Sequence, residues 1–129
     1  MQLLLDTHIF LWFLNGDPQL SQGFCNVIKD PKNSVYLSVV SIWEAIIKYQ
    51  LDKLPLPESP EIYLPKQRDR HQIMSLMIDE KSVLQLINLP PLHRDPFDRL
   101  IICQAIQNDL TIITVDHKIR SYPIIKILN

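Results

Sequence analysis

The sequence has few glycines and cysteines, little net charge and no long apolar run. Its two glycines, Gly16 and Gly23, cannot supply a P-loop or a glycine-rich dinucleotide fingerprint, so side chains or a metal must hold any phosphate. Cys25 and Cys103 show no C-x-x-C spacing, which favours free thiols in a reducing compartment. No apolar run approaches the roughly 20 residues of a membrane span, and the opening MQLLLD meets a charge too early for a secretory leader. We therefore expect a cytoplasmic protein with no membrane partner.

The length and charge of the chain limit its class without naming its chemistry. With 129 residues, 47% of them hydrophobic, the chain fits a single domain over residues 1–129 with one substantial core. The formal net charge is -1, so local basic patches would have to hold a nucleic acid, since a general positive field is absent.

Apolar segments rich in β-formers alternate with segments of helical periodicity. We expect strands at residues 2–5, 34–37, 73–78, 112–115 and 123–128. We expect helices at residues 7–14, 20–29, 41–51, 60–70, 79–86 and 95–110, with prolines marking irregular stretches at 55–65 and at 90–91. Because the strands are too apolar to have a wet face, the pattern predicts a three-layer α/β/α sandwich around a mainly parallel sheet.

Acidic residues follow the expected strands or lie in the first turns of the expected helices. These residues are Asp6, Glu44, Asp95, Asp98 and Asp116. The carboxyl ends of parallel strands share one edge of a sheet, so acids far apart in the chain can converge there. Two like charges about 4 Å apart repel by roughly 4 kcal/mol at an effective dielectric near 20, so several carboxylates stay ionised together only around a cation. The pattern therefore predicts a metal-dependent site.

The same acids also fit ordinary helix caps. Asp6 and Asp116 stand where a side chain can accept backbone N–H bonds, an interaction that contributes about 1 kcal/mol. Ser41 and Glu44 fit the S-x-x-E capping box, and Asp95 with Asp98 fits a looser version.

Asp98 shifts the balance towards a metal site. Apolar residues follow it at three, four and seven positions, so its carboxylate lies on the apolar side of its own helix. Burying this second carboxylate is costly without a partner, and a metal or Arg99 is the partner that the sequence offers.

Four segments resemble the acidic motifs of PIN-domain ribonucleases, particularly the VapC-like toxins of type II toxin–antitoxin systems. The segments are LLLDTHIFLW, SVVSIWEAIIK, HRDPFDRLIICQA and TIITVD, and their order and spacing match, whereas residues 51–89 match poorly. The resemblance implies a PIN-like fold in which the four catalytic acids are Asp6, Glu44, Asp98 and Asp116.

The resemblance also implies a cofactor and a reaction. The cofactor would be Mg²⁺ or Mn²⁺, which prefer oxygen ligands. We expect Asp6 and Asp98 as direct ligands, while Glu44 and Asp116 position a second metal ion or orient the attacking water. The expected reaction is RNA hydrolysis that leaves a 5′ phosphate and a 3′ hydroxyl.

Other polar residues near the motifs are weaker candidates. Thr7 and Ser41 are expected to hydrogen-bond a carboxylate or a metal-bound water, and Asp95 to cap its helix and support the acids. Arg94 and Arg99 fit either a phosphate clamp or ion pairs with nearby acids. We expect His8 and His93 to be structural or adjacent to the substrate. We expect Trp12 and Trp43 to lie in the core. A further group forms either a basic surface for RNA or an ordinary solvated helix surface: Lys66, Arg68, Arg70 and His71.

The resemblance implies partners and leaves alternatives open. The partners are an RNA substrate, a small antitoxin that enters the acidic groove, and a second copy of the chain, paired near Trp43 or the proline-rich middle. The alternatives are a flap-type DNA nuclease, which usually needs extra modules, an inactive PIN-like interaction module, and a receiver-type phosphoacceptor, for which Asp6 stands too early in the chain.

Overall fold

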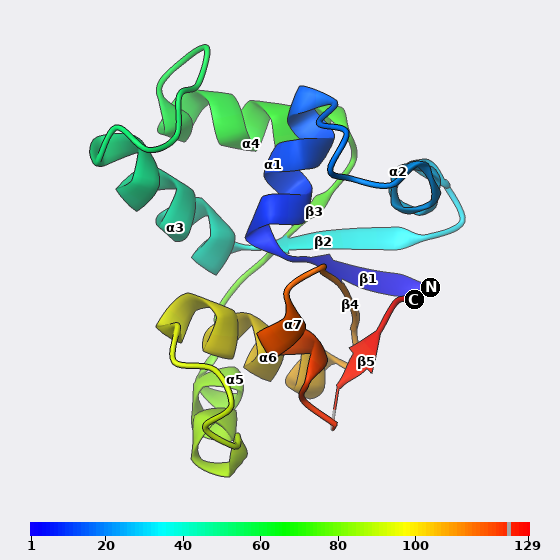
Figure 1. Ribbon diagram of the computed structural model, residues 1–129, viewed down its shortest axis with the longest axis vertical. Helices are drawn as coiled ribbons and strands as arrows, with labels where there is room; N and C mark the ends of the chain where they lie inside the picture. The colour runs from blue at the N-terminus through cyan, green and yellow to red at the C-terminus, as the bar shows by residue number, and fades with distance from the viewer. Residues whose placement is uncertain (124) are drawn as a thin grey trace.

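One parallel sheet forms the centre of the molecule in the computed structural model, which describes residues 1–123 and 125–129 (Figure 1). The strands of the described chain are β1 (Gln2–Leu5), β2 (Ser34–Ser38), β3 (Met74–Leu76), β4 (Thr111–Ile113) and β5 (Lys126–Ile127). They lie in the order β3-β2-β1-β4-β5, and every pair of neighbours is parallel. The central strand β1 pairs on one side with β2, where Leu3 lies opposite Val35, and on the other with β4. The predicted parallel sheet is confirmed.

Helices cover both faces of the sheet. They are α1 (Thr7–Asn15), α2 (Gln22–Lys29), α3 (Val39–Gln50), α4 (Pro60–Arg70), α5 (Glu80–Leu84), α6 (Pro96–Asn108) and α7 (His117–Arg120), with a 3₁₀ turn η1 (Gln85–Asn88) after α5. Leu3 and Leu5 of β1 pack into one core cluster with residues of α1, α2 and α4. Leu4 points to the opposite face, where its cluster includes residues of α6 and α7. Figure 1 shows these two helical layers above and below the sheet, so the predicted three-layer sandwich is confirmed.

Capping residues explain where two of the key helices begin and end. Asp95 accepts hydrogen bonds from the backbone N–H groups of Phe97 and Asp98, and Pro96 occupies the first turn of α6, where its missing N–H costs nothing. The helix α1 ends at Gly16, whose φ of 60° glycine adopts without strain.

The start of α3 differs from the prediction. The helix begins at Val39, because Ser38 at the end of β2 accepts a hydrogen bond from the backbone N–H of Val40. Ser41, predicted to open the helix, is buried inside it. The predicted Ser41–Glu44 capping box is therefore wrong, and the side chain of Glu44 is not held at the helix terminus.

Several boundaries also differ from the prediction. The strand expected at 73–78 is limited to the three residues that pair with β2, and the helix expected at 79–86 changes to a 3₁₀ turn after Leu84. Pro65, also expected to mark an irregular stretch, lies inside α4, whose bounds match the helix expected at 60–70. The strand expected at 123–128 is observed over Lys126–Ile127, and its residue 124 lies outside the described residues.

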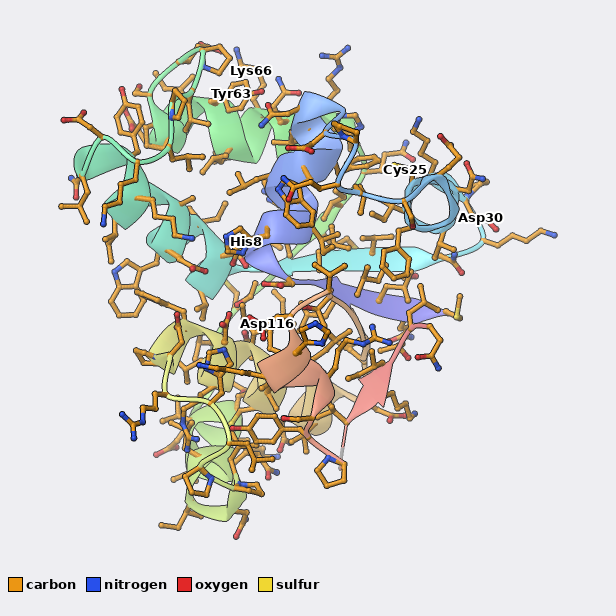
Figure 2. All side chains as sticks on the ribbon, viewed as in Figure 1. His8, Cys25, Asp30, Tyr63, Lys66 and Asp116 are labelled. Atoms are coloured by element: carbon orange, nitrogen blue, oxygen red, sulfur yellow. The ribbon has the colours of Figure 1, made fainter. Side chains whose placement is uncertain are left out.

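The two thiols and one of the two tryptophans lie as predicted. Cys25 and Cys103 are both free thiols, as predicted (Cys25 is labelled in Figure 2). Trp12 packs against the core cluster, but Trp43 is 52% exposed, so its predicted place in the core is wrong. Its ring forms a T-shaped pair with that of Phe97, with ring centroids 4.8 Å apart. Within the described residues, none of the helices has the length and apolar character that crossing a bilayer requires.

Candidate metal centre

The carboxyl edge of the sheet gathers the predicted acids from four segments. Asp6 directly follows β1, and its backbone N–H donates to the carbonyl of Ile113 in β4, 3.0 Å away. Asp116 follows β4, Glu44 lies on α3 and Asp98 on α6. Figure 2 shows Asp116 below the sheet edge and His8, at the start of α1, above it. The topology therefore brings residues more than 100 positions apart to one place, as the parallel arrangement predicts.

Asp6 is buried without acting as a helix cap. It is 3% exposed and occupies the position before α1, yet its side chain makes no capping hydrogen bond. Instead, Thr114 Oγ1 donates a hydrogen bond to Asp6 Oδ2 over 2.8 Å. Burial raises the pKa of Asp6, and the nearby charges of Glu44 and Asp116 raise it further, while the Thr114 hydrogen bond and His8 oppose the shift. The capping explanation for Asp6 is thus wrong.

Asp98 is the most perturbed carboxyl group of the cluster. It is 8% exposed, and burial is the main cause that raises its pKa from 3.8 to about 8. The negative charges of Asp6, Asp95, Glu44 and Asp116 raise it further, in that order. Because such repulsion falls off with distance, these acids lie close enough to Asp98 to act on its charge.

His93 is the side chain nearest to the Asp98 carboxylate. Its Nε2 lies 2.8 Å from Asp98 Oδ2 and 3.8 Å from Asp116 Oδ2, so these three residues place one ligand-type atom each within 4.8 Å of the others. The short contact lacks hydrogen-bond geometry, which leaves Nε2 without a hydrogen-bond partner in the described chain. Nδ1 accepts from the backbone N–H of Asp95, so a neutral ring carries its proton on Nε2.

The predicted partner of Asp98 was a metal ion or Arg99, and the second of these is wrong. Arg99 Nη1 donates to the carbonyls of Pro90 and His93, 3.3 and 3.2 Å away. Arg99 therefore fixes the loop that carries His93. Arg94, the other predicted phosphate clamp, is exposed.

Asp116 and Asp95 use one oxygen each as a cap. Asp116 Oδ1 accepts from the backbone N–H groups of Lys118 and Ile119, which leaves Oδ2 towards His93. Asp95 Oδ1 caps α6, as predicted. For Asp116 the capping and metal-binding interpretations are therefore compatible, because the carboxylate has an oxygen for each.

Glu44 borders the cluster from α3. Its Oε2 lies 3.2 Å from Lys48 Nζ, one helical turn further on, whereas Oε1 is buried and has no hydrogen-bond partner in the described chain. Beside it, Thr7 Oγ1 donates to Ser41 Oγ over 2.8 Å, which links the start of α1 to α3. This hydrogen bond joins the two hydroxyls to each other rather than to a carboxylate. Their predicted role beside a metal ion stays a prediction.

Two side chains that contact the acids, Thr114 and Lys48, were not predicted from the sequence. Thr114 lies two residues before Asp116, directly after a strand, and could have been found as a polar residue at the carboxyl edge. Lys48 lies four residues after Glu44, the spacing of helical ion pairs. The expected basic surface on α4 is partly neutralised, since Lys66 pairs with Glu58 over 2.8 Å and Arg68 with Asp69 over 3.1 Å (Lys66 is labelled in Figure 2).

The side chains of the cluster fit a hard divalent cation. Asp6 and Asp98 are buried carboxyls with raised pKa values, and Glu44 offers a buried oxygen without a partner. Asp116 adds an oxygen that the helix cap does not use. Oxygen donors of this kind suit Mg²⁺ or Mn²⁺, and a bound cation would offset the repulsion among the acids.

Comparison with known proteins points to one family. A family model described as "PIN domain" matches residues 3–125. A curated relative, Ribonuclease VapC16 of Mycobacterium tuberculosis, is 40% identical over 53 residues. The matched segment spans 41% of this chain and 38% of that relative.

Solved structures share the fold across the whole chain. A structure of VapBC2 from Rickettsia felis, bound to a promoter DNA fragment, matches 100% of this chain and 98% of its own, with a TM-score of 0.74 and 20% identity. A toxin–antitoxin complex from Klebsiella pneumoniae matches 98% of this chain and 95% of its own, with a TM-score of 0.64 and 16% identity. At these identities the likeness shows the fold alone.

Proposed function

This chain belongs to the PIN-domain family, and we propose that it is a divalent-metal-dependent endoribonuclease that serves as the toxin of a toxin–antitoxin pair. The observation that carries the proposal is the convergence of Asp6, Glu44, Asp98 and Asp116 at one sheet edge. Asp6, Glu44 and Asp116 each raise the pKa of Asp98, and the pKa of Asp6 is itself raised. The name of the relative that matches 53 residues, a ribonuclease, supports RNA as the substrate.

Asp6 and Asp98 are the proposed direct ligands of Mg²⁺ or Mn²⁺, joined by the free Oδ2 of Asp116. Glu44 holds a second ion or orients the attacking water. When bound, the cation supplies positive charge that offsets the phosphoryl oxygens and makes a water molecule a stronger nucleophile. In the proposed hydrolysis, water would bond to phosphorus as the P–O3′ bond breaks, and its proton would end on the 3′ oxygen, leaving a 5′ phosphate and a 3′ hydroxyl. The acids would hold the ion and the water in position for this reaction.

Neighbouring side chains hold the acids in position. The Thr114 hydroxyl fixes the orientation of the Asp6 carboxylate by donating a hydrogen bond to Oδ2. His93 lies against both Asp98 and Asp116, and Arg99 holds the backbone carbonyl of His93. Lys48 neutralises Glu44 at the rim. Arg94 is exposed beside this loop and remains a candidate for contacts with RNA phosphates.

A small antitoxin and a second copy of the chain are the proposed protein partners. A structural relative is described as a toxin–antitoxin complex, and a buried acidic cluster suits a basic side chain delivered by such a partner. The half-exposed indole of Trp43 supports a homodimer paired near α3. Light scattering of the purified protein tests the dimer, and a monomer would contradict it. Co-expression with the adjacent small gene tests the antitoxin, and a failure of the two proteins to co-purify would contradict that proposal.

The central experiment measures RNA cleavage by the purified protein with Mg²⁺, with Mn²⁺ and with EDTA. Asp6→Asn keeps the shape of the side chain and removes its charge, so we expect cleavage to be lost. A matched control is Asp109→Asn, because Asp109 is exposed, pairs with Lys126 over 2.6 Å and adopts a left-handed conformation that asparagine tolerates. Cleavage that survives both EDTA and Asp6→Asn would refute the proposal, and preferential cleavage of flap DNA would favour the DNA-nuclease alternative.

A further inference from the structure

A pocket of about 340 Å³ lies between α1 and α3, directly beside the acid cluster. Its principal lining residues are His8, Leu11, Trp12, Lys48, Lys53 and Leu54. The volume lies within the roughly 300–1,000 Å³ typical of small-ligand pockets, near the lower end, and is suited to one nucleotide rather than to a bulky chain.

The pocket and the acid cluster share a cation. Lys48 Nζ lies 3.2 Å from Glu44 Oε2 and 3.3 Å from His8 Nε2, so the same ammonium group borders the acids and the wall of the pocket. A polymer whose scissile phosphate sits at the acids therefore has a neighbouring unit within reach of this pocket.

The pocket combines a flat aromatic ring with an apolar floor. Trp12 is half-buried, and its ring is tilted by 51° to that of His8, with centroids 6.1 Å apart. Leu11 and Leu54 supply the apolar surface beside it. An aromatic ring of this kind can stack a nucleobase of any identity, because every base presents a π face.

The charged groups around the pocket favour an anionic ligand. Lys53 is exposed and held in place at the end of α3, where its backbone N–H donates to the carbonyl of Lys48 over 2.9 Å. The acid that lines the pocket, Asp17, accepts hydrogen bonds from the backbone and side chain of Gln19. The wall carries two lysines, and because Lys48 is shared with Glu44, Lys53 is the cation that the pocket offers to a phosphate in a chain whose net charge is -1.

We infer that this pocket binds the nucleotide next to the cleaved bond of single-stranded RNA, with its base against Trp12 and its phosphate near Lys48 and Lys53. The inference rests on the proposed ribonuclease function and adds the way in which the substrate is held.

Binding can be measured without cleavage. The chain has two tryptophans, so Trp43→Phe leaves Trp12 as the single indole and Trp12→Phe leaves Trp43. The probe is a mixed-sequence, single-stranded 2′-O-methyl oligoribonucleotide, which is resistant to cleavage, titrated in EDTA. We expect its addition to quench the fluorescence of the Trp43→Phe protein and to leave that of Trp12→Phe nearly unchanged.

Two further variants test the roles of the ring and the charge. Trp12→Leu removes the stacking surface and should weaken oligonucleotide binding by about 5- to 150-fold, whereas Trp12→Phe should retain most of it. Lys53→Gln should reduce the slope of log K against log salt by about 0.7, the effect of one lost phosphate contact with a single strand. With RNA as substrate, the loss should fall on KM rather than on kcat. Because Lys53 is exposed, its variant remains informative if Trp12→Leu fails to fold.

Quenching in Trp12→Phe but not in Trp43→Phe would overturn the inference, as would an unchanged affinity in both Trp12→Leu and Lys53→Gln. Unchanged RNA binding combined with lost capture of the co-expressed antitoxin would assign the pocket to a protein and also overturn it. The two proposals fail separately: cleavage without Trp12 quenching contradicts the pocket alone, whereas quenching without metal-dependent cleavage contradicts the nuclease alone.

Discussion

Replacing Asp98 with asparagine should make the metal-free protein less sensitive to rising pH. Burial and the surrounding acids raise the pKa of this carboxyl from 3.8 to about 8, so the folded protein holds the proton that the unfolded chain releases near pH 4. The stability that this group contributes is therefore fully present below about pH 4 and is lost as the pH rises through 8. Asparagine does not titrate, so the Asp98→Asn protein should not lose this stability as the pH rises.

The pKa shift sets an upper limit on the size of the effect. Each pH unit between the two pKa values changes the free energy of unfolding by about 1.36 kcal/mol, so the three units from pH 5 to pH 8 amount to at most about 4 kcal/mol. Because the neighbouring acids share the repulsion, we expect the wild-type protein to lose a few kcal/mol more of its free energy of unfolding than Asp98→Asn does. That is still a large part of the roughly 5–15 kcal/mol that stabilises a typical domain.

Urea denaturation in EDTA at pH 5 and pH 8 measures the effect. The wild-type protein should lose more stability between the two pH values than Asp98→Asn, and Asp109→Asn should behave like the wild type because its carboxylate is exposed and paired with Lys126. Adding Mg²⁺ at pH 8 should restore the wild type and leave Asp98→Asn unchanged. Parallel pH profiles of the wild type and Asp98→Asn would refute the reasoning.

Three further predictions follow from the same contacts. Thr114→Val removes the hydroxyl that donates to Asp6, so the pKa of Asp6 rises further and the Mn²⁺ affinity at pH 6, measured by calorimetry, falls more than at pH 8. Asp95→Ala removes the cap of α6 and lowers the free energy of unfolding by about 1 kcal/mol in urea, whereas Asp95→Asn retains most of it. Mg²⁺ at about 100 times its dissociation constant raises the free energy of unfolding by about 2.7 kcal/mol, and an unchanged urea midpoint would contradict binding to the folded state.

The layer architecture could be predicted from sequence because it depends on local patterns. The three leucines of QLLL place apolar side chains on both faces, as a strand covered on both sides must, and DPFD carries the cap and proline that start α6. The boundaries that failed depend on partners elsewhere in the chain. Ser38 and Ser41 are both good caps, and the length of β2 decides between them. The length of β3 is likewise set by the three residues of β2 that it can pair with.

The acids of the site could be predicted from their places after strands and at helix starts, but their partners could not. His93 comes from a loop, and its approach to Asp98 depends on how Arg99 and Tyr122 hold that loop. The exposure of Trp43 similarly depends on how closely α3 and α6 approach each other. Such distances are properties of the packed structure, and no spacing within one segment encodes them.

A Mn²⁺ titration followed by electron paramagnetic resonance tests the central claim most directly, because it reports bound ion without requiring the RNA substrate. The wild-type protein and Asp109→Asn should bind Mn²⁺ alike at pH 8, and Asp6→Asn and Asp98→Asn should each bind it much more weakly. Equal binding by all four proteins, or no binding by the wild type, would contradict a cation site formed by the converging acids.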